Sequence, residues 1–121
     1  MNGNDIVIVS ATRTAIGKFG GQFATTSAIE LGTTVAKAAI QKANLSPEQI
    51  DTVIFGNVLQ AGLGQNPARQ VGLGAGLNHA STAVTINEVC GSGLKAIISA
   101  AQVLRLGDAK IVLAGGMENM S

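Results

Sequence analysis

The sequence of 121 residues has no tryptophan, no tyrosine, three phenylalanines and a single cysteine. One cysteine excludes an internal disulfide, and one cysteine with one histidine gives no ligand set for a metal site. Charged residues make up only 12%, and the eight basic and seven acidic residues are scattered along the chain. The sequence therefore lacks the basic stripe and the aromatic rings with which a protein binds nucleic acid.

Membrane segments and export signals are also lacking. No apolar run approaches the roughly 18 residues that a membrane span needs. Met1–Asp5 has no basic residue of the kind that begins a signal peptide. We therefore expect no membrane partner and a cytoplasmic protein, in which a single cysteine stays reduced.

Glycine and apolar residues are abundant instead. The sequence has 16 glycines and 46% hydrophobic residues, enough for one substantial core in a chain of 121 residues. Few charges and many glycines together predict closely packed backbone layers. They also predict that some faces are covered by a second copy of the chain or by further sequence.

Four short apolar runs favour β-strands, at Asp5–Val9, Asp51–Phe55, Ala83–Ile86 and Lys110–Ala114. They show almost no alternation of apolar and polar residues. Strands of this kind are covered on both faces, which is typical of parallel sheets with helical crossovers.

The segments between these runs favour helices. Ser27–Ala43 has an apolar face and opens with Ser27 and Glu30 at the spacing of a capping box. Gly91–Leu106 is apolar nearly all round, which predicts a helix buried between layers. Two shorter elements are predicted, a capped turn at Ser46–Gln49 and a short helix or packed loop at Ala68–Leu77.

The order of these elements predicts the fold class. Strands that alternate with helices indicate an α/β domain with a largely parallel sheet and right-handed crossovers. The last predicted strand runs almost to Ser121, so little sequence is left to complete a domain. We therefore expect residues 1–121 to be part of a truncated domain.

The only cysteine lies where such a sheet binds ligands. Cys90 follows the third predicted strand and precedes the apolar helix, at the carboxyl edge of the sheet. The unpaired N–H groups and the positive end of the helix dipole favour the nucleophilic thiolate there. Gly91 and Gly93 would let the chain turn sharply and a substrate carbonyl approach, and backbone N–H groups could hold an oxyanion. From position alone, a small buried apolar cysteine fits equally well.

The same residues also support a different class of site. Gly91, Gly93 and Ala96 match the fingerprint G-x-G-x-x-(G/A) of dinucleotide-binding proteins, after a strand and at the start of a helix. Glu118, near the end of the next strand, would then bind the ribose. A non-catalytic dinucleotide-binding module is therefore one alternative, and a structural fragment with no ligand is another.

The remaining chemical groups are less informative. His79 precedes the strand that Cys90 follows, so the two lie at opposite ends of it and His79 is predicted to be a surface loop residue. Most acidic residues occupy helix starts or strand edges, where they are solvated or cap a helix. Only Glu88 and Glu118 lie near the carboxyl edge of the sheet.

Four motifs, in this order along the chain, resemble those of thiolases: Val9–Gly17, Gln65–Gln70, Asn87–Ala96 and Gly115–Ser121. The likeness covers the whole chain, and the block around Cys90 is the most specific. Gly91 after the cysteine resembles the biosynthetic members, which join two acetyl-CoA molecules into acetoacetyl-CoA and free CoA. In the degradative members serine tends to follow the nucleophile.

The resemblance implies a thiolase-like fold, α/β/α layers around a mostly parallel mixed sheet, of which this chain holds part of the amino-terminal repeat. It implies that Cys90 is the nucleophile of an acyltransferase and carries the acyl-thioester intermediate of a Claisen condensation or its reverse, thiolysis. Acetyl-CoA, acetoacetyl-CoA and CoA would be substrates and products, with no permanently bound cofactor. The enzyme would be a homodimer or homotetramer, with Gln65–Gln70 near a subunit contact.

In thiolases the acid and base groups of the second step come from the carboxyl-terminal half: a histidine, an asparagine and a second cysteine in motifs that this chain does not contain. The chain alone is therefore expected to be inactive. Ketoacyl synthases, which use a similar fold and a similarly placed cysteine, are the nearest enzyme alternative.

Overall fold

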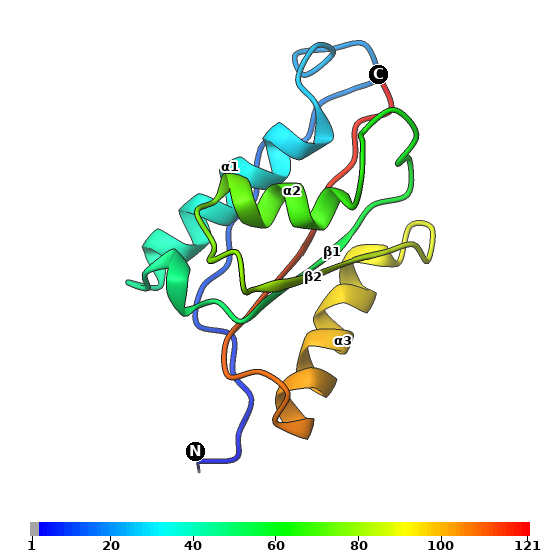
Figure 1. Cartoon of the computed structure of the whole chain (residues 1–121). Coiled ribbons are helices and arrows are strands. Elements are labelled where there is room, and N and C mark those ends of the chain that lie inside the picture. The colour runs from blue at the N-terminus through cyan, green and yellow to red at the C-terminus, as the bar shows by residue number, and fades with distance from the viewer. Residues whose placement is uncertain (1–2) are drawn as a thin grey trace.

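The computed structural model describes residues 3–121, so Met1 and Asn2 of the segment considered above for export lie outside the described residues. The described chain contains, in order, α1 (Ala28–Lys42), the short 3-10 helix η1 (Pro47–Gln49), β1 (Thr52–Gly56), α2 (Pro67–Gly74), β2 (Thr82–Ile86), α3 (Ser92–Leu106) and β3 (Val112–Gly116). Figure 1 shows the path of these elements. The predicted α/β class is confirmed.

Over residues 3–121 the strands form one three-stranded parallel sheet in the order β2-β1-β3. All five residues of β1 are buried, which explains why its sequence is apolar without alternation. Gly56 at the end of β1 pairs with Ile86 of β2 and with Gly116 of β3. The three strands therefore end level, and the segments that follow them meet at one edge.

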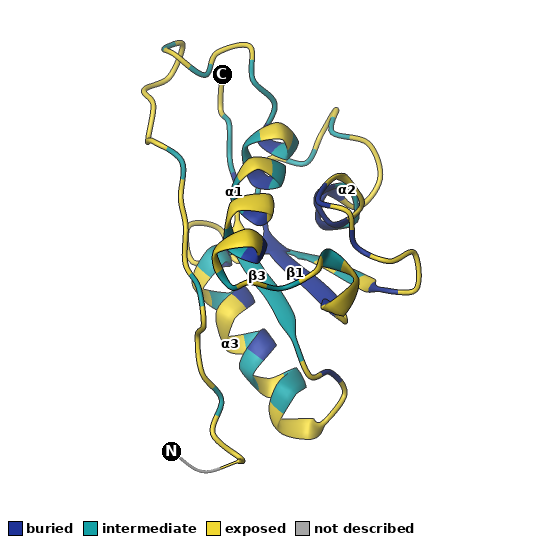
Figure 2. Ribbon diagram, turned by 90° about the vertical axis from the view of Figure 1, so that its left-hand side faces the viewer, coloured by how far each residue is buried: buried dark blue, intermediate teal, exposed yellow. Residues whose placement is uncertain are grey.

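Helices cover both faces of the sheet. Val53 and Phe55 of β1 pack against α1 and α2 in one cluster, which includes Ala36 and Val71. Ile54, whose side chain points to the other face, packs against Ala96 and Ala100 of α3. Figure 2 shows α3 on the side of the sheet away from α1. The result is the predicted three-layer α/β/α arrangement.

The capping box predicted at Ser27 and Glu30 is confirmed, and α2 and α3 also have defined ends. Ser27 Oγ accepts a hydrogen bond from Glu30 N (3.1 Å), and Glu30 Oε2 accepts one from Ser27 N (2.7 Å), so both bonds of the capping box are present. Asn66 caps α2 through Arg69 N. Gly107 ends α3 with φ of 80°, in the left-handed region that favours glycine.

The predicted strand at Asp5–Val9 is wrong. Residues 5–9 are exposed for the most part, with Ile8 76% and Val9 68% accessible, and they form no strand in the described chain. The following residues are attached to α1 instead: Thr12 Oγ1 donates to Val35 O (2.9 Å). An apolar run becomes a strand only where a sheet edge pairs with it, and no edge of this sheet does.

The prediction that α3 is buried all round is also wrong for the described chain. Its inner face is buried through Ser92, Ala96 and Ala100, but Leu94 is 65% and Ile98 45% accessible. By length and hydropathy alone, the window 89–106 is apolar enough to cross a membrane, which corrects the expectation that no run approaches that length. The same composition is found in helices that proteins bury between layers.

Candidate functional site

The cleft that contains Cys90 lies at the carboxyl edge of the sheet, as the topology predicts. It has a volume of about 530 Å³. The segments after all three strands supply its walls: Val58 and Leu59 after β1, Val89 and Cys90 after β2, and Met117, Glu118 and Met120 after β3. Three parts of the chain that are distant in sequence therefore surround one thiol.

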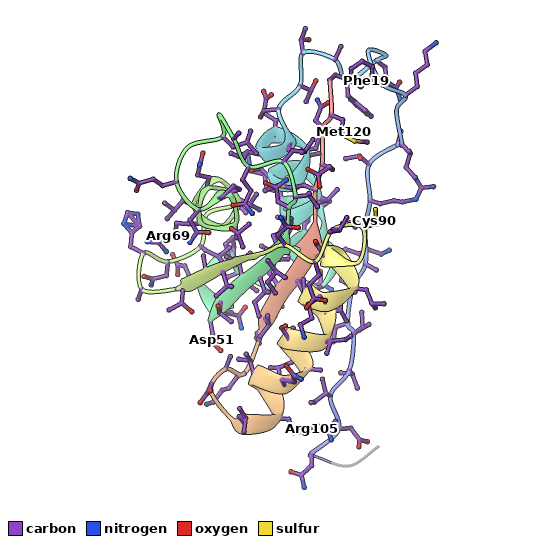
Figure 3. All side chains as sticks on the ribbon, turned by 90° about the vertical axis from the view of Figure 1, so that its right-hand side faces the viewer. Phe19, Asp51, Arg69, Cys90, Arg105 and Met120 are labelled. Carbon is purple, nitrogen blue, oxygen red and sulfur yellow. The ribbon has the colours of Figure 1, made fainter. Side chains whose placement is uncertain are left out.

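Cys90 is exposed and lies at the amino-terminal end of α3. Figure 3 shows it on the same side of the molecule as Met120. The structure therefore decides against the small buried apolar residue that position alone had left open. No side chain caps α3, because its N-cap residue is Gly91. Gly93 N–H donates no hydrogen bond within the described chain. Its nitrogen packs on the end of β1, where a Cβ on Gly56 would lie 2.7 Å from it.

The sharp turn before α3 falls on Val89 rather than on a glycine. Val89 has φ of 53°, in the left-handed region that a β-branched residue rarely adopts. Gly91 has φ of −87°, which any residue can adopt, and a Cβ there would meet only Glu88 O, at 3.5 Å. The backbone does not require glycine at position 91. That Gly91 eases the approach of a substrate stays a prediction.

Glycines also allow α3 to approach the sheet closely. A Cβ at Gly56 would lie 2.5 Å from the carbonyl carbon of Ser92, and one at Gly116 would lie 3.2 Å from Gly93 Cα. The backbone of α3 therefore rests directly on the last residues of β1 and β3, and this contact fixes the height of Cys90 above the sheet. Sequence reasoning missed Gly56; the available signal was that two paired strands both end in glycine.

Glu118 holds two walls of the cleft together. Its carboxylate accepts hydrogen bonds from Val58 N (3.0 Å), Leu59 N (2.9 Å) and Asn57 Nδ2 (3.1 Å). Asn57 is completely buried and also donates to Met117 O (3.0 Å). Three hydrogen bonds thus engage the carboxylate within the chain, where it joins two loops rather than standing open for a ribose. Asn57 was also missed from the sequence, where a single asparagine after a strand gives no signal.

The other candidates lie away from the thiol or at the margin of the cleft. His79 is exposed in the loop before β2, at the opposite end of that strand, as predicted. Glu88 is exposed and faces Lys95 at 3.8 Å. Arg69 donates to Ser81 O (2.6 Å) and to His79 O, so it holds that loop. Among residues 3–121 no three His, Cys, Asp or Glu side chains come together as a metal site.

The family description "Thiolase, N-terminal domain" matches residues 6–121. The chain belongs to the thiolase family. The dinucleotide-binding alternative is therefore wrong, in agreement with the hydrogen-bonded carboxylate of Glu118.

Relatives and solved structures agree with this assignment. The chain is 60% identical over 117 residues to an acetyl-CoA acetyltransferase of Cupriavidus necator, and 60% identical over 115 residues to one of Escherichia coli. These matches cover 97% and 95% of the chain, but only 30% and 29% of the two relatives. An enzyme of Mus musculus named acetyl-CoA acetyltransferase, cytosolic, is 54% identical over 116 residues, which are 96% of the chain and 29% of that protein. The chain spans less than a third of the length of these relatives.

The thiolase Acat5 of Ascaris suum, solved in complex with coenzyme A, superposes on this structure with a TM-score of 0.89. The two are 46% identical, and the match covers 90% of this chain and 28% of that one. The predicted thiolase-like fold is confirmed. The described chain corresponds to part of the amino-terminal region of that fold.

Proposed function

We propose that Cys90 is the acetyl-accepting nucleophile of an acetyl-CoA acetyltransferase, and that residues 1–121 act as part of the amino-terminal domain of a longer enzyme. The observation that carries this proposal is an exposed thiol at the start of α3, beside a cleft, in a chain of the thiolase family. The names of the relatives support the choice of acetyl-CoA over other thioesters, and of a thiolase over a ketoacyl synthase.

The first step exchanges one thioester for another. The Cys90 sulfur, as thiolate, attacks the carbonyl carbon of acetyl-CoA, and the bond between that carbon and the CoA sulfur breaks. CoA leaves as a thiol and carries away the proton that Cys90 gave up. Because the bond formed and the bond broken are of the same kind, the acetyl-enzyme forms at little cost in bond energy. Backbone N–H groups of the turn around Cys90 would stabilise the negatively charged oxygen of the tetrahedral intermediate.

The second step needs groups that the described residues do not bring to the cleft. A carbanion must form at the methyl of a second acetyl-CoA, which requires a general base. His79 lies at the other end of β2, and the carboxylate of Glu118 is held by three donors. We therefore expect the isolated chain neither to condense acetyl-CoA nor to cleave acetoacetyl-CoA. In the longer enzyme CoA is a substrate and product rather than a bound cofactor.

The proposal includes an assembly and a location. The accessible apolar residues of α3 support an enzyme in which further sequence or a second copy of the chain covers this helix. The homodimer or homotetramer is proposed from the resemblance to thiolases. The printed name of the Mus musculus relative supports a cytoplasmic enzyme.

Ligand protection tests the proposal. Acetyl-CoA is expected to slow the alkylation of Cys90 by iodoacetamide, because it occupies the cleft and acylates the sulfur, whereas NAD is expected to leave the rate unchanged. A Cys90→Ala variant controls for label elsewhere in the chain. Alkylation that acetyl-CoA does not slow would contradict the proposed role of Cys90.

A further inference from the structure

The residue before the cysteine adopts a costly backbone conformation. Val89 has φ of 53°, and its side chain is 65% accessible, so packing of that side chain does not explain the conformation. A strained residue next to a reactive group persists only where its surroundings hold it in place. Other groups of the chain must therefore hold Val89 in this conformation.

A single hydroxyl bridges both sides of this residue. Ser92 Oγ accepts a hydrogen bond from Glu88 N and donates one to Val89 O, both at 2.7 Å. Two backbone bonds support the same turn, from Gly91 N to Glu88 O (3.1 Å) and from Ser92 N to Val89 O (3.2 Å). The Asn87 side chain also supports Val89, because Asn87 Oδ1 accepts a hydrogen bond from Val89 N (2.9 Å). Among the described residues, the Ser92 hydroxyl is the only side-chain group that bonds to both Glu88 and Val89.

Ser92 is itself buried and closely packed. It is 4% accessible, and its Cβ packs against Gly56 so closely that a Cβ on that glycine would lie 2.7 Å away. The central strand of the sheet therefore supports the serine, and the serine supports the turn. Buried hydroxyls with both hydrogen bonds made are rigid anchor points.

We infer that Ser92 is a positioning residue for Cys90: its hydroxyl holds Val89 in the left-handed conformation and so fixes the Cys90 amide and thiol relative to the cleft. The described chain has no cis peptide bond, so the Cys90 N–H points opposite to the Val89 carbonyl that Ser92 holds. Fixing that carbonyl therefore aims the Cys90 N–H away from Ser92. The catalytic relevance of this arrangement rests on the proposed function.

The test compares Ser92→Ala with wild type in the purified protein. The rate of acetyl transfer from saturating acetyl-CoA to Cys90 is expected to fall between about tenfold and about a hundredfold, because a displaced sulfur or amide misses the thioester. The half-saturating acetyl-CoA concentration should change by less than about twofold, since the hydroxyl does not touch the ligand. Ser99→Ala, the same change later in α3, is the matched control and should leave both values unchanged.

Alkylation of Cys90 by iodoacetamide separates this inference from the proposed function. If wild type takes no acetyl group, the proposed function is wrong, and the alkylation rate alone decides the role of Ser92. The inference predicts at least about a threefold lower rate in Ser92→Ala, because the sulfur leaves its place at the start of the helix. Wild-type alkylation in Ser92→Ala, or an equal loss in Ser99→Ala, would overturn it.

A second variant keeps the test decisive if Ser92→Ala does not fold. Glycine adopts a φ of 53° without strain. The substitution Val89→Gly therefore removes the backbone strain against which the Ser92 hydroxyl is inferred to hold residue 89. The double variant Ser92→Ala/Val89→Gly should fold and should regain part of the lost rate, yet react more slowly than Val89→Gly alone. Equal rates in these two variants would show that the hydroxyl positions nothing.

Discussion

At the scale of single residues, the walls of the cleft are held by side chains that bond to backbone amides. Glu118 accepts from two amides after β1, and Ser92 bonds to both sides of Val89. Backbone amides have fixed directions, so these bonds set the course of each loop. Removing one such side chain leaves several partners without a bond at once.

Glu118→Gln is expected to destabilise the protein by about 1 to 3 kcal/mol, because the amide replaces one acceptor oxygen by a donor that faces N–H groups. The free energy of unfolding, measured by urea denaturation, checks this. Glu48→Gln is the control, since Glu48 is exposed and its side chain makes no hydrogen bond within the described chain. Equal stability of Glu118→Gln and wild type would show that the carboxylate does not hold the two loops.

Asp51 contributes a pH-dependent interaction at the other end of the sheet. Hydrogen bonds from Lys110 N (2.7 Å) and Ile111 N (3.1 Å) lower the pKa of the Asp51 carboxyl below its ordinary value of 3.8. The charged form is thus favoured in the folded protein, so this stabilisation is fully present above 3.8 and is lost as the pH falls through the lowered value.

Wild type is therefore expected to be more stable than Asp51→Asn near neutral pH, with a difference that shrinks in acid. Thermal melting over a pH series measures it. Asp108→Asn serves as control, because the Asp108 side chain makes no hydrogen bond within residues 3–121. A difference that grows in acid would contradict the account of Asp51.

At the scale of elements, local signals predicted the helices and the central strand well. The capping box of α1 joins residues that are three positions apart, so the sequence alone reveals it. The strand β1 is buried on both faces, so its run of apolar residues is visible in the sequence as well. The segment 5–9 and the outer face of α3 were predicted wrongly. Strand pairing and helix burial depend on which other segments lie against them in space, and the local sequence does not contain that information. For the same reason the sequence pointed to Cys90 but not to Asn57, whose partners follow a different strand.

Contact between α3 and β1 gives a test at this scale. Gly56→Ala is expected to destabilise the protein by about 2 kcal/mol or more, because the new methyl would overlap the Ser92 and Gly93 backbone, which cannot give way easily. Gly91→Ala is the matched control: its φ suits alanine and its Cβ has room, so only the poorer N-cap should count, and stability should change by about 1 kcal/mol or less. Urea denaturation of both variants would show whether the close approach exists; equal losses would contradict it.

At the scale of the whole molecule, the described chain leaves apolar surface in contact with water. Ile8, Leu94 and Ile97 are 76%, 65% and 44% accessible. Accessible apolar residues that cluster on one helix mark surfaces that another protein surface covers. The core between the sheet and α1, by contrast, consists of buried residues of the described chain.

The purified chain is therefore expected to self-associate through α3. Replacing Leu94 and Ile98 by glutamine should shift the protein toward monomer in sedimentation velocity. The cost in folding stability should be about 1 kcal/mol or less, because Leu94 is 65% and Ile98 45% accessible. Lys37→Gln, an exposed change on α1, should leave the association as it is. A wild-type chain that is monomeric at high concentration would contradict this prediction.

The most direct test of the central claim is the intact mass of the purified protein before and after acetyl-CoA, with peptide mapping around Cys90. The account predicts a gain of one acetyl group, located on Cys90 and absent from Cys90→Ala. A wild-type mass that acetyl-CoA leaves unchanged, or an acetyl group located on another residue, would contradict the proposal that Cys90 is the acyl-accepting nucleophile.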